Sequence, residues 1–499
     1  MSTNSFSIPE FAEPDPDALF LASRQGLRTY GDLHRFSQYF LEQLQTVTGD
    51  LDTPVGFIAE SCDELVMAIA SCWLCGIPFV CFDPSATDDE LRKQLSKLEL
   101  SVVVTGKSFT MTITSEPTLS LQSLDLERAI THANHDPGPQ TGTIDPNRVF
   151  GYFFTSGTTG IPKIVPLKRR QMLFAAKASA ENFRPQVNHF WLLCLPMNHI
   201  GGISIILRSL LYGSGIYRMG SFRKEMVTSF LSENKLFQAA SFVPTMLKRL
   251  LEIPAFRTHN NFRAILLGGG PILKTLVEKA VNKGIPVVAS YGMTETCAQI
   301  AANPYLKPSG TYIPKKSVGR IFPPNEIQIR DDGGTPLGRN NSGVIWLKGP
   351  QVFDGYRDPS LNNRVFDENG WFRTGDFGHI NANGHLFIET RRSDLIVTGG
   401  ENVSPEEVEN ELVKYSEIRE AAVLGLPDEE WGQRVVAVVV GIDDHKLDEQ
   451  LVRKKLEKRL SPYKIPKQLL QVDSLPTNRT GKVVRRELVK LFEQKDRTQ

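Results

Sequence analysis

The amino-acid sequence predicts a mixed α/β protein, with a large N-terminal domain and a small α+β domain at the C-terminus. Three observations predict this fold class. Strand-like apolar runs alternate with helix-length runs up to about residue 292, short strands with Gly, Asn and Asp turns follow from about residue 317, and helical patterns return near residue 391. Strands that alternate with helices are typical of βαβ units in a parallel sheet. The domains are therefore placed at 1–391 and 392–499.

The first α/β layer is predicted between residues 26 and 106. The stretch 26–44 has a turn-like start followed by apolar residues at helical spacing, which indicate that a turn leads into a helix. Strands are then predicted at 54–59, 78–82 and 101–106, with helices between them at 62–76 and 87–98. This alternation places the strands in one parallel sheet.

The second α/β layer is predicted between residues 189 and 292. Its strands are expected at 189–196, 215–220, 238–243, 262–269 and 286–292, and its helices at 201–213, 223–235, 244–252 and 271–284. From about residue 317, short strands between turn residues predict a small antiparallel barrel. In the C-terminal domain we expect strands at 394–400, 420–426 and 435–441 and helices at 404–415 and 447–460.

Composition excludes several classes of protein. The net charge is +1, which argues against a nucleic-acid partner or a charged membrane surface. The apolar stretch 203–211 contains Arg208 and is shorter than the roughly 20 residues of a membrane helix, and the N-terminus lacks a secretory pattern. We therefore expect a cytoplasmic protein without stable membrane insertion. Cys72 and Cys75 form a CxxC in a predicted buried helix, and without further ligands they are expected to be buried thiols.

The segment YFFTSGTTGIPK, residues 152–163, has the composition of an anion-binding loop. Its glycines let backbone N–H groups converge, its hydroxyl side chains add donors and Lys163 adds a positive charge. A Walker A loop is excluded, because Lys163 lies three residues beyond the second glycine and follows a proline. On composition alone, a polar surface turn stays open. The candidate phosphate ligands are Thr155, Ser156, Gly157, Thr158, Thr159, Gly160 and Lys163.

Five motifs, in order along most of the chain, resemble those of the adenylate-forming superfamily of acyl-CoA synthetases, luciferases and adenylation domains. The loop above is similar to the family's phosphate loop. The others are SYGMTE at 290–295, RTGD at 373–376, RRSDLIVTGGENVSPEEVE from residue 391 and NRTGKVVRREL at 478–488. This resemblance implies a large N-terminal domain that binds ATP and acid, followed by a small mobile domain that carries a catalytic lysine.

The resemblance also implies the residues that bind the nucleotide. Tyr291 would offer a flat face to adenine, Asp376 would accept from ribose hydroxyls, and Glu295 would bind Mg²⁺ through a hard carboxylate oxygen. Lys482 would reach the carboxylate and the α-phosphate, and Arg391 would contact ribose or phosphates. Further implied site residues are Gly269, Gly270, Ser290, Gly292 and Thr294.

The implied reaction has two steps. A carboxylate attacks the α-phosphate of ATP and releases pyrophosphate, and a thiol, implied to be that of coenzyme A, then displaces AMP from the acyl-adenylate. In the family the C-terminal domain rotates between the steps, so Gly399 and Gly400 would line the thiol tunnel. At the hinge this chain has Ser393, where many relatives have Asp, which leaves the choice of pivot residue open. A homo-oligomer stays possible.

The acyl pocket is predicted from three segments of the second layer. The candidate acyl lining is 195–206, 241–247 and 266–271, where His199 would gate the pocket or bind a polar substrate, and a packed histidine is the alternative. Residues 195–205, 266–301 and 391–409 resemble the o-succinylbenzoate–CoA ligases of menaquinone biosynthesis, although Asn198 replaces the apolar residue often found before this histidine. Three alternatives stay open: another aryl- or fatty-acyl-CoA synthetase, an adenylation enzyme that charges a carrier protein, and a non-catalytic scaffold.

Overall fold

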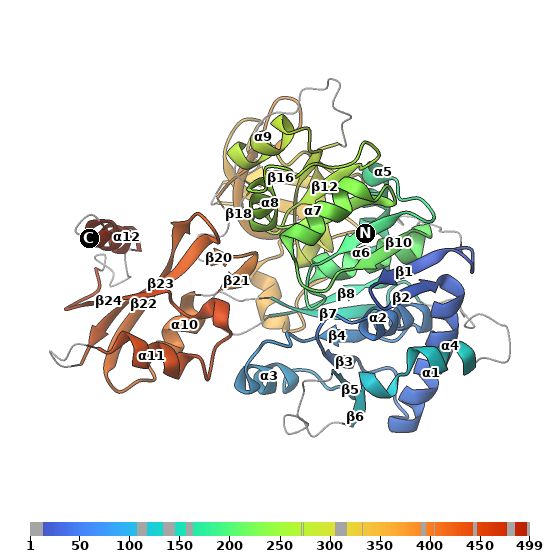
Figure 1. Cartoon of the computed structure of the whole chain (residues 1–499). Coiled ribbons are helices and arrows are strands. Elements are labelled where there is room, and N and C mark those ends of the chain that lie inside the picture. Colours follow the sequence, from blue (N-terminus) through green and yellow to red (C-terminus); the bar gives the residue numbers. More distant parts are fainter. Residues whose placement is uncertain are drawn as a thin grey trace. The chain divides into compact units, whose positions relative to one another are not determined.

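The computed structural model describes residues 13–106, 117–132, 145–155, 163–270, 272, 274–304, 317–331, 333–390, 396–403, 405–442, 447–476 and 485–496 (Figure 1). They form two compact units. The first spans Met1–Pro84, Leu95–Phe154 and Ile164–Arg391, and the second spans Ser85–Gln94, Thr155–Lys163 and Arg392–Gln499. The assignment of nucleotide and acid binding to 1–391, and of a moving catalytic domain to 392–499, stays a prediction.

The largest sheet has nine strands, and six neighbouring strands in its centre run parallel. Strand β2 at one end and strands β14 and β15 at the other are antiparallel to their neighbours. In spatial order the strands are β15 (Arg320–Ile321), β14 (Ala298–Ala302), β13 (Val287–Met293), β12 (Ala264–Leu267), β11 (Phe237–Phe242), β9 (Phe190–Leu193), β10 (Gly215–Arg218), β1 (Leu19–Ser23) and β2 (Gly26–Thr29).

The second sheet of this unit has six strands, and the pairs that β3 forms with β4 and β5 are parallel. Every residue of β3, β4 and β5 is buried, as expected for a parallel sheet that is covered on both faces. In spatial order its strands are β6 (Thr118–Ser120), β5 (Val102–Thr105), β3 (Val55–Ile58), β4 (Phe79–Cys81), β7 (Val149–Thr155) and β8 (Lys163–Lys168).

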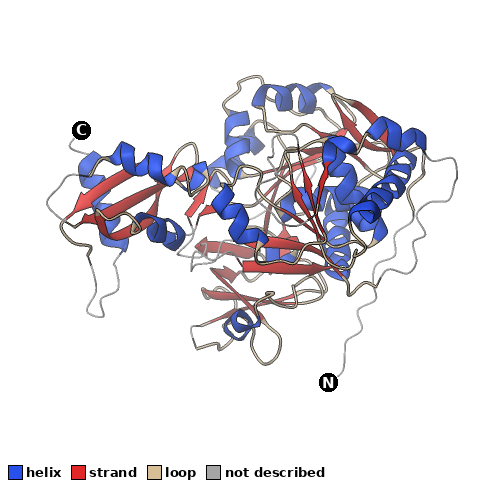
Figure 2. Cartoon of the chain, turned by 90° about the horizontal axis from the view of Figure 1, so that it is seen from below, coloured by secondary structure: helices blue, strands red, loops and turns tan. Residues whose placement is uncertain are grey.

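Helices cover these sheets, and their ends carry recognisable signals (Figures 1 and 2). Thr29 and Asp32 form a capping box at the start of α1, and α2 ends at Gly76 in the left-handed conformation. The helices outside the C-terminal residues are α1 (Tyr30–Val47), α2 (Asp63–Cys75), α3 (Asp88–Leu95), α4 (Leu126–His132), α5 (Arg169–Phe183), α6 (Ile200–Tyr212), α7 (Lys224–Glu233), α8 (Pro244–Leu251) and α9 (Lys274–Asn282).

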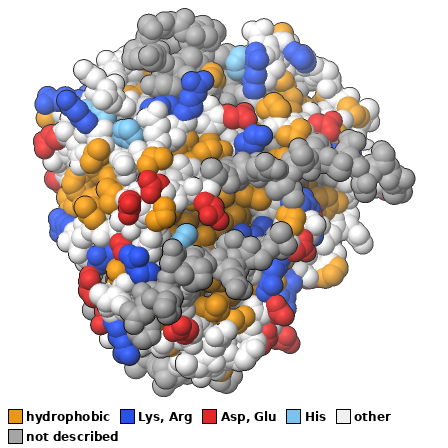
Figure 3. Space-filling model, turned by 90° about the vertical axis from the view of Figure 1, so that its right-hand side faces the viewer, with side chains coloured by type: hydrophobic (Ala, Val, Ile, Leu, Met, Phe, Trp, Pro, Cys, Tyr) orange, Lys and Arg blue, Asp and Glu red, His pale blue; other side chains and the backbone are white. Residues whose placement is uncertain are grey.

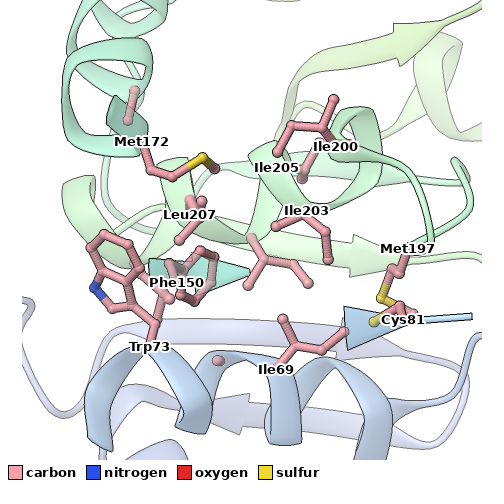
Figure 4. Close-up of a cluster of buried hydrophobic side chains, with 14 of the residues drawn as sticks. Ile69, Trp73, Cys81, Phe150, Met172, Met197, Ile200, Ile203, Ile205 and Leu207 are labelled. Atoms are coloured by element: carbon pink, nitrogen blue, oxygen red, sulfur yellow. The ribbon is translucent and has the colours of Figure 1, made fainter. Parts of the chain in front are cut away.

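A hydrophobic core joins the two α/β layers. Figure 4 shows side chains of α2 and α6 that point toward one another, with Phe150 of β7 beside Trp73. The Trp73 and Phe150 rings are 4.9 Å apart and lie edge to face. Each large apolar side chain that is buried here contributes roughly 1.5–3 kcal/mol to folding, so this cluster fixes the first layer against the second.

A four-stranded antiparallel sheet follows the second layer. Its strands, in order, are β16 (Glu326–Arg330), β17 (Gly343–Lys348), β18 (Phe372–Ile380) and β19 (Leu386–Thr390). The barrel predicted from the sequence is thus a half-barrel. Short 3₁₀ helices elsewhere in the first compact unit are η1 (Leu121–Ser123) and η2 (Thr294–Thr296), and η3 (Pro359–Arg364) lies between β17 and β18.

The C-terminal residues form a small α+β fold around one five-stranded sheet. Its strands are β21 (Glu401–Val403), β20 (Ile396–Thr398), β23 (Gly432–Gly441) and β22 (Ile418–Asp428) in spatial order, with β24 (Gln468–Val472) paired to β23. Its helices are α10 (Pro405–Leu412), α11 (Glu449–Leu456), η4 (Pro462–Lys464) and α12 (Arg485–Asp496).

A buried ionic cluster lies within the second compact unit. Lys464 Nζ lies 2.7 Å from Glu90 Oε1 and 2.9 Å from Glu407 Oε1, and Ser461 Oγ donates to Glu90 Oε2 at 2.7 Å. Glu90 belongs to α3, where it also forms a capping box with Thr87. Burial would lower the pKa of Lys464, but the charges of Glu407 and Glu90 outweigh it and raise that pKa. Glu90 thus joins α3 to η4 and α10.

The structure confirms the predicted fold class and the alternating strands and helices of both layers. One element was predicted wrongly: residues 26–29 are not a turn at the start of a helix but form strand β2, which pairs with β1.

Cys72 is buried and Cys75 half-buried, both thiols are free, and burial raises the pKa of Cys75 to about 11. None of the described helices is long and apolar enough to cross a membrane. Positive and negative side chains are mixed over the face shown in Figure 3.

Candidate active site

Four neighbouring parallel strands bring predicted site segments to one edge of the nine-stranded sheet. Strand β9 leads to His199, β11 to the acyl segment 241–247, β12 to Gly269 and Gly270, and β13 to Glu295. The carboxyl ends of neighbouring parallel strands lie at the same edge, where open α/β sheets bind ligands. The topology therefore gathers segments that are about 100 residues apart in the sequence.

A hydrogen bond joins two of the predicted nucleotide ligands. The hydroxyl of Tyr291, on β13, donates to Asp376 Oδ2, on β18, at 2.7 Å, and both side chains are buried. The strand around Tyr291 is tightly packed, because a Cβ on Gly292 would lie 1.7 Å from the carbonyl oxygen of Ala298. Asp376 is therefore held in one orientation, as a residue that binds a ribose hydroxyl requires.

Tyr291→Phe is expected to raise the KM for ATP about 3- to 10-fold, because a typical intramolecular hydrogen bond contributes on the order of 1 kcal/mol. The phenyl ring keeps the face predicted to contact adenine, so kcat is expected to change less than KM. Steady-state kinetics with varied ATP measures both constants. An unchanged KM for ATP would contradict the positioning of Asp376 by Tyr291.

Glu295 is buried in η2, and two described hydrogen bonds join it to residues 353 and 356. Its Oε1 accepts from Tyr356 Oη at 2.7 Å, and its backbone oxygen accepts from Phe353 N at 2.8 Å. Among the described residues, no three His, Cys, Asp or Glu side chains form a metal cluster. A single carboxylate nevertheless fits Mg²⁺, which is commonly bound by one or two carboxylates together with substrate phosphates and water.

The predicted phosphate loop is framed by two described residues. Thr155 ends β7 and Lys163 begins β8. The buried Oγ1 of Thr155 has no hydrogen-bond partner among the described residues, which suits a group that awaits a ligand. The rest of the loop, Ser156, Gly157, Thr158, Thr159 and Gly160, lies outside the described residues, as do Arg391, Ser393 and Lys482. Their roles stay predictions.

The remaining predicted residues occupy turns or strand ends. His199 is the half-buried N-cap of α6, and Thr294 is half-buried in η2. The hydroxyl of Ser290 donates to the backbone oxygen of Leu267 at 3.0 Å and so ties β13 to the end of β12. Gly399 and Gly400 form the turn between β20 and β21, with φ of 60° and 91°. A Cβ on Gly399 would lie 2.8 Å from the Trp431 ring, so a side chain is sterically excluded there.

Sequence reasoning missed Arg208 as a candidate site residue. This α6 side chain is 3% exposed, and its Nε and Nη2 have no hydrogen-bond partner among the described residues. Burial lowers the pKa of Arg208 to about 9, so it is still a cation at neutral pH. Its guanidinium stacks on Trp191 at 4.1 Å, and Trp191 Nε1 donates to Ser241 Oγ at 3.0 Å. In the sequence, the signal that could have indicated Arg208 is its position as a charged residue within a largely apolar helix.

The fold and the site together define a nucleotide-binding α/β enzyme with a separate α+β C-terminal region. Residues 8–357 match the AMP-binding enzyme family, and residues 407–482 match the AMP-binding enzyme C-terminal domain. The chain belongs to the AMP-binding enzyme family, the adenylate-forming superfamily that the five motifs indicated.

Curated relatives and solved structures agree with this membership. The chain is 34% identical to the 2-succinylbenzoate–CoA ligase of Oceanobacillus iheyensis, over 96% of this chain and 97% of that protein. It is 32% identical to the same ligase of Enterococcus faecalis, over 95% of both. A double mutant of o-succinylbenzoate CoA synthetase from Bacillus subtilis, bound with its product analogue OSB-NCoA, has a TM-score of 0.84 at 30% identity and covers 95% of this chain and 96% of that one. The same Bacillus subtilis synthetase in complex with ATP and a magnesium ion has a TM-score of 0.67 at 30% identity, covering 95% and 97%.

Proposed function

We propose that this protein is an AMP-forming acid–CoA ligase whose acid is 2-succinylbenzoate, and that it acts in menaquinone biosynthesis. The acid carboxylate attacks the α-phosphate of ATP, the bond to the β-phosphate breaks, and pyrophosphate leaves. The CoA thiol, on losing its proton, then attacks the acyl carbon, and AMP leaves with the bonding electrons. Identity above 30% over nearly whole chains with 2-succinylbenzoate–CoA ligases supports this choice.

Arg208 is the observation that carries the choice of a dicarboxylic acid. Arg208 is a buried cation, and its burial lowers its pKa. Its guanidinium stacks on Trp191, whose indole N–H donates to Ser241, the first residue of the predicted lining segment 241–247. Such an uncompensated charge is costly in a folded protein. An aromatic acid with a second carboxylate would offset that cost, because only one of its carboxylates is consumed by adenylation. A fatty acid has no second carboxylate.

The other residues position the reactants rather than act as nucleophiles. Tyr291 and Asp376 would hold the adenosine, the loop from Thr155 to Lys163 the leaving phosphates, and Glu295 a Mg²⁺ ion. Bound Mg²⁺ would neutralise charge that develops on the phosphates. Lys482 would stabilise the charge at the α-phosphate, and His199 would line the acyl pocket. The proposal places these ligands in domain 1–391, except for Lys482 in domain 392–499, and the enzyme in the cytoplasm.

A ligation screen tests the proposal. The protein is incubated with ATP, Mg²⁺, CoA and one acid at a time: aromatic dicarboxylates including 2-succinylbenzoate, simple benzoates, and fatty acids. We expect 2-succinylbenzoate to give the highest kcat/KM, with one AMP and one pyrophosphate per thioester. A preference for a long-chain fatty acid would overturn the choice of acid. Transfer to a carrier protein but not to CoA would overturn the ligase assignment, and no acid-dependent pyrophosphate release would favour a scaffold.

A further inference from the structure

The segment that follows β17, residues 351–357 and here called the clamp segment, has no regular secondary structure, but five of its seven residues are buried. Gln351 is 0% exposed, Phe353 2% and Tyr356 3%. The Phe353 and Tyr356 rings pack edge to face with centroids 4.9 Å apart, and the Asn362 side chain hydrogen-bonds both the N–H and the carbonyl of Tyr356. A buried irregular segment that is fixed so closely has little freedom to move its side chains.

The clamp segment holds the η2 turn through several hydrogen bonds. Phe353 N donates to the backbone oxygen of Glu295 at 2.8 Å, and Gln351 Nε2 donates to the backbone oxygens of Thr296 and Gln299. The bonds to Glu295 and Thr296 fix the backbone of η2, and the bond to Gln299 fixes the adjoining start of β14. Tyr356 makes the one described hydrogen bond from this segment to a side chain of η2, from Oη to Glu295 Oε1 at 2.7 Å.

The same segment is tied to the strand that leaves the predicted phosphate loop. Arg357 N donates to the backbone oxygen of Ile164 at 3.0 Å. Asp354 pairs with Lys168, at the end of β8, at 2.8 Å and with Arg170, in α5, at 2.6 Å. Glu295 is therefore positioned relative to β8 through seven consecutive residues. Glu295 of η2 would contact the metal, and Lys163 at the start of β8 would contact the phosphates.

We propose that Tyr356 is a positioning residue for the metal site, and that its hydroxyl fixes the orientation in which Glu295 binds Mg²⁺. The inference rests on the proposed function. Outer-shell hydrogen bonds orient metal ligands, and losing one typically costs about 10- to 100-fold in metal affinity or activity. The sequence alone did not indicate this role, because Tyr356 and Glu295 are 61 residues apart and Tyr356 lies outside the motifs that were recognised.

Tyr356→Phe tests the proposal, because it removes the hydroxyl and keeps the packed ring. Mn²⁺ is titrated into protein that carries one equivalent of ATP and no acid, with the same ATP without protein as the baseline, and binding is followed by electron paramagnetic resonance. We expect the Kd for Mn²⁺ to rise about 10- to 100-fold. ATP binding in EDTA should stay at the wild-type value. In turnover, the Mg²⁺ concentration for half-maximal rate should rise by a similar factor, with kcat at saturating Mg²⁺ changed less.

Tyr30→Phe is the matched control. The Tyr30 hydroxyl is also buried, and it donates to the backbone oxygens of Ser209 and Ser214 at 2.5 and 2.8 Å. Its loss is expected to lower stability while the Mn²⁺ affinity stays at the wild-type value. If Tyr356→Phe and Tyr30→Phe lose equal stability and both keep the wild-type Mn²⁺ affinity, the role proposed for Tyr356 is wrong while the proposed function stands. A wild-type protein that binds no Mn²⁺ together with ATP would overturn the proposed function as well.

Discussion

Replacing Arg208 by methionine is expected to weaken the binding of 2-succinylbenzoate about 30-fold without lowering the stability of the fold. A hydrogen bond to a charged group contributes roughly 1.5–3 kcal/mol, and a loss of about 2 kcal/mol corresponds to about 30-fold in affinity. The loss should appear in the KM for the acid and not in the KM for ATP. Because Arg208 has no compensating carboxylate among the described residues, the apolar replacement should leave the melting temperature unchanged or raise it.

Arg169→Met is the matched control for this prediction. Arg169 is also buried over a tryptophan ring, 3.8 Å from the centroid of Trp73, but it donates to the backbone oxygen of Trp73 at 2.7 Å and begins α5. Its replacement should destabilise the protein and leave the KM for the acid unchanged. Arg208→Lys should retain part of the affinity, since it keeps the charge. If Arg208→Met loses no selectivity for dicarboxylic over monocarboxylic acids, the role assigned to Arg208 is wrong.

Replacing Lys464 by methionine is expected to destabilise the second compact unit by about 3–5 kcal/mol, the typical cost of removing one partner from a buried ion pair. The variant leaves the carboxylates of Glu90 and Glu407 buried with their common cation removed. Hydrogen–deuterium exchange of β22 and β23 in increasing denaturant measures the change within this unit, because intrinsic fluorescence would combine all five tryptophans of the chain. Lys490→Met removes an exposed pair with Glu487 in the same unit, and should change stability by less than about 1 kcal/mol.

The pH dependence of the Lys464 variant gives a second readout. In the wild type, burial would raise the pKa of Glu90, but Lys464 outweighs it and lowers that pKa, so this contribution is lost as the pH falls through the folded-state value. Burial raises the pKa of Glu407 even beside Lys464. Without the lysine both carboxyls should titrate above their ordinary range, and a carboxyl with a raised folded-state pKa stabilises the fold as the pH falls. The difference in free energy of unfolding between the wild type and Lys464→Met should therefore shrink from pH 7.5 to 5.5. A difference that is independent of pH would contradict the ionic account.

The local elements of this fold were predictable because their signals are local. The apolar runs of β3, β4 and β5 are fully buried strands, and the helix with the CxxC is α2. The mistaken turn at residues 26–29 has a physical reason. Strand β2 is short and mostly exposed, and it is held by pairing with β1, which was itself not predicted. Edge strands of this kind have no periodic apolar pattern that single-sequence reasoning can detect.

The site was predictable only one residue at a time. Motif resemblance suggested Tyr291, Glu295 and Asp376 as candidates, but it did not give the hydrogen bond that joins Tyr291 to a residue 85 positions later. Tyr356 and Arg208 were missed because the roles proposed for them depend on partners that lie far away in the sequence. A tyrosine in a loop and an arginine in an apolar helix are ordinary in a sequence, and they become informative only once their burial and contacts are known.

The order of synthesis gives the cluster around Glu90 a further consequence. Glu90 and Lys464 are 374 residues apart, so at roughly 5–20 residues per second the ribosome makes the lysine about 20–75 s after the glutamate. During that interval the acidic first turn of α3 must persist in water without its cation. The reciprocal hydrogen bonds between Glu90 and Thr87 provide a local partner for this carboxylate. A fragment that begins at residue 392 would lack α3 altogether, and its Lys464 would lose one of its two buried carboxylate partners.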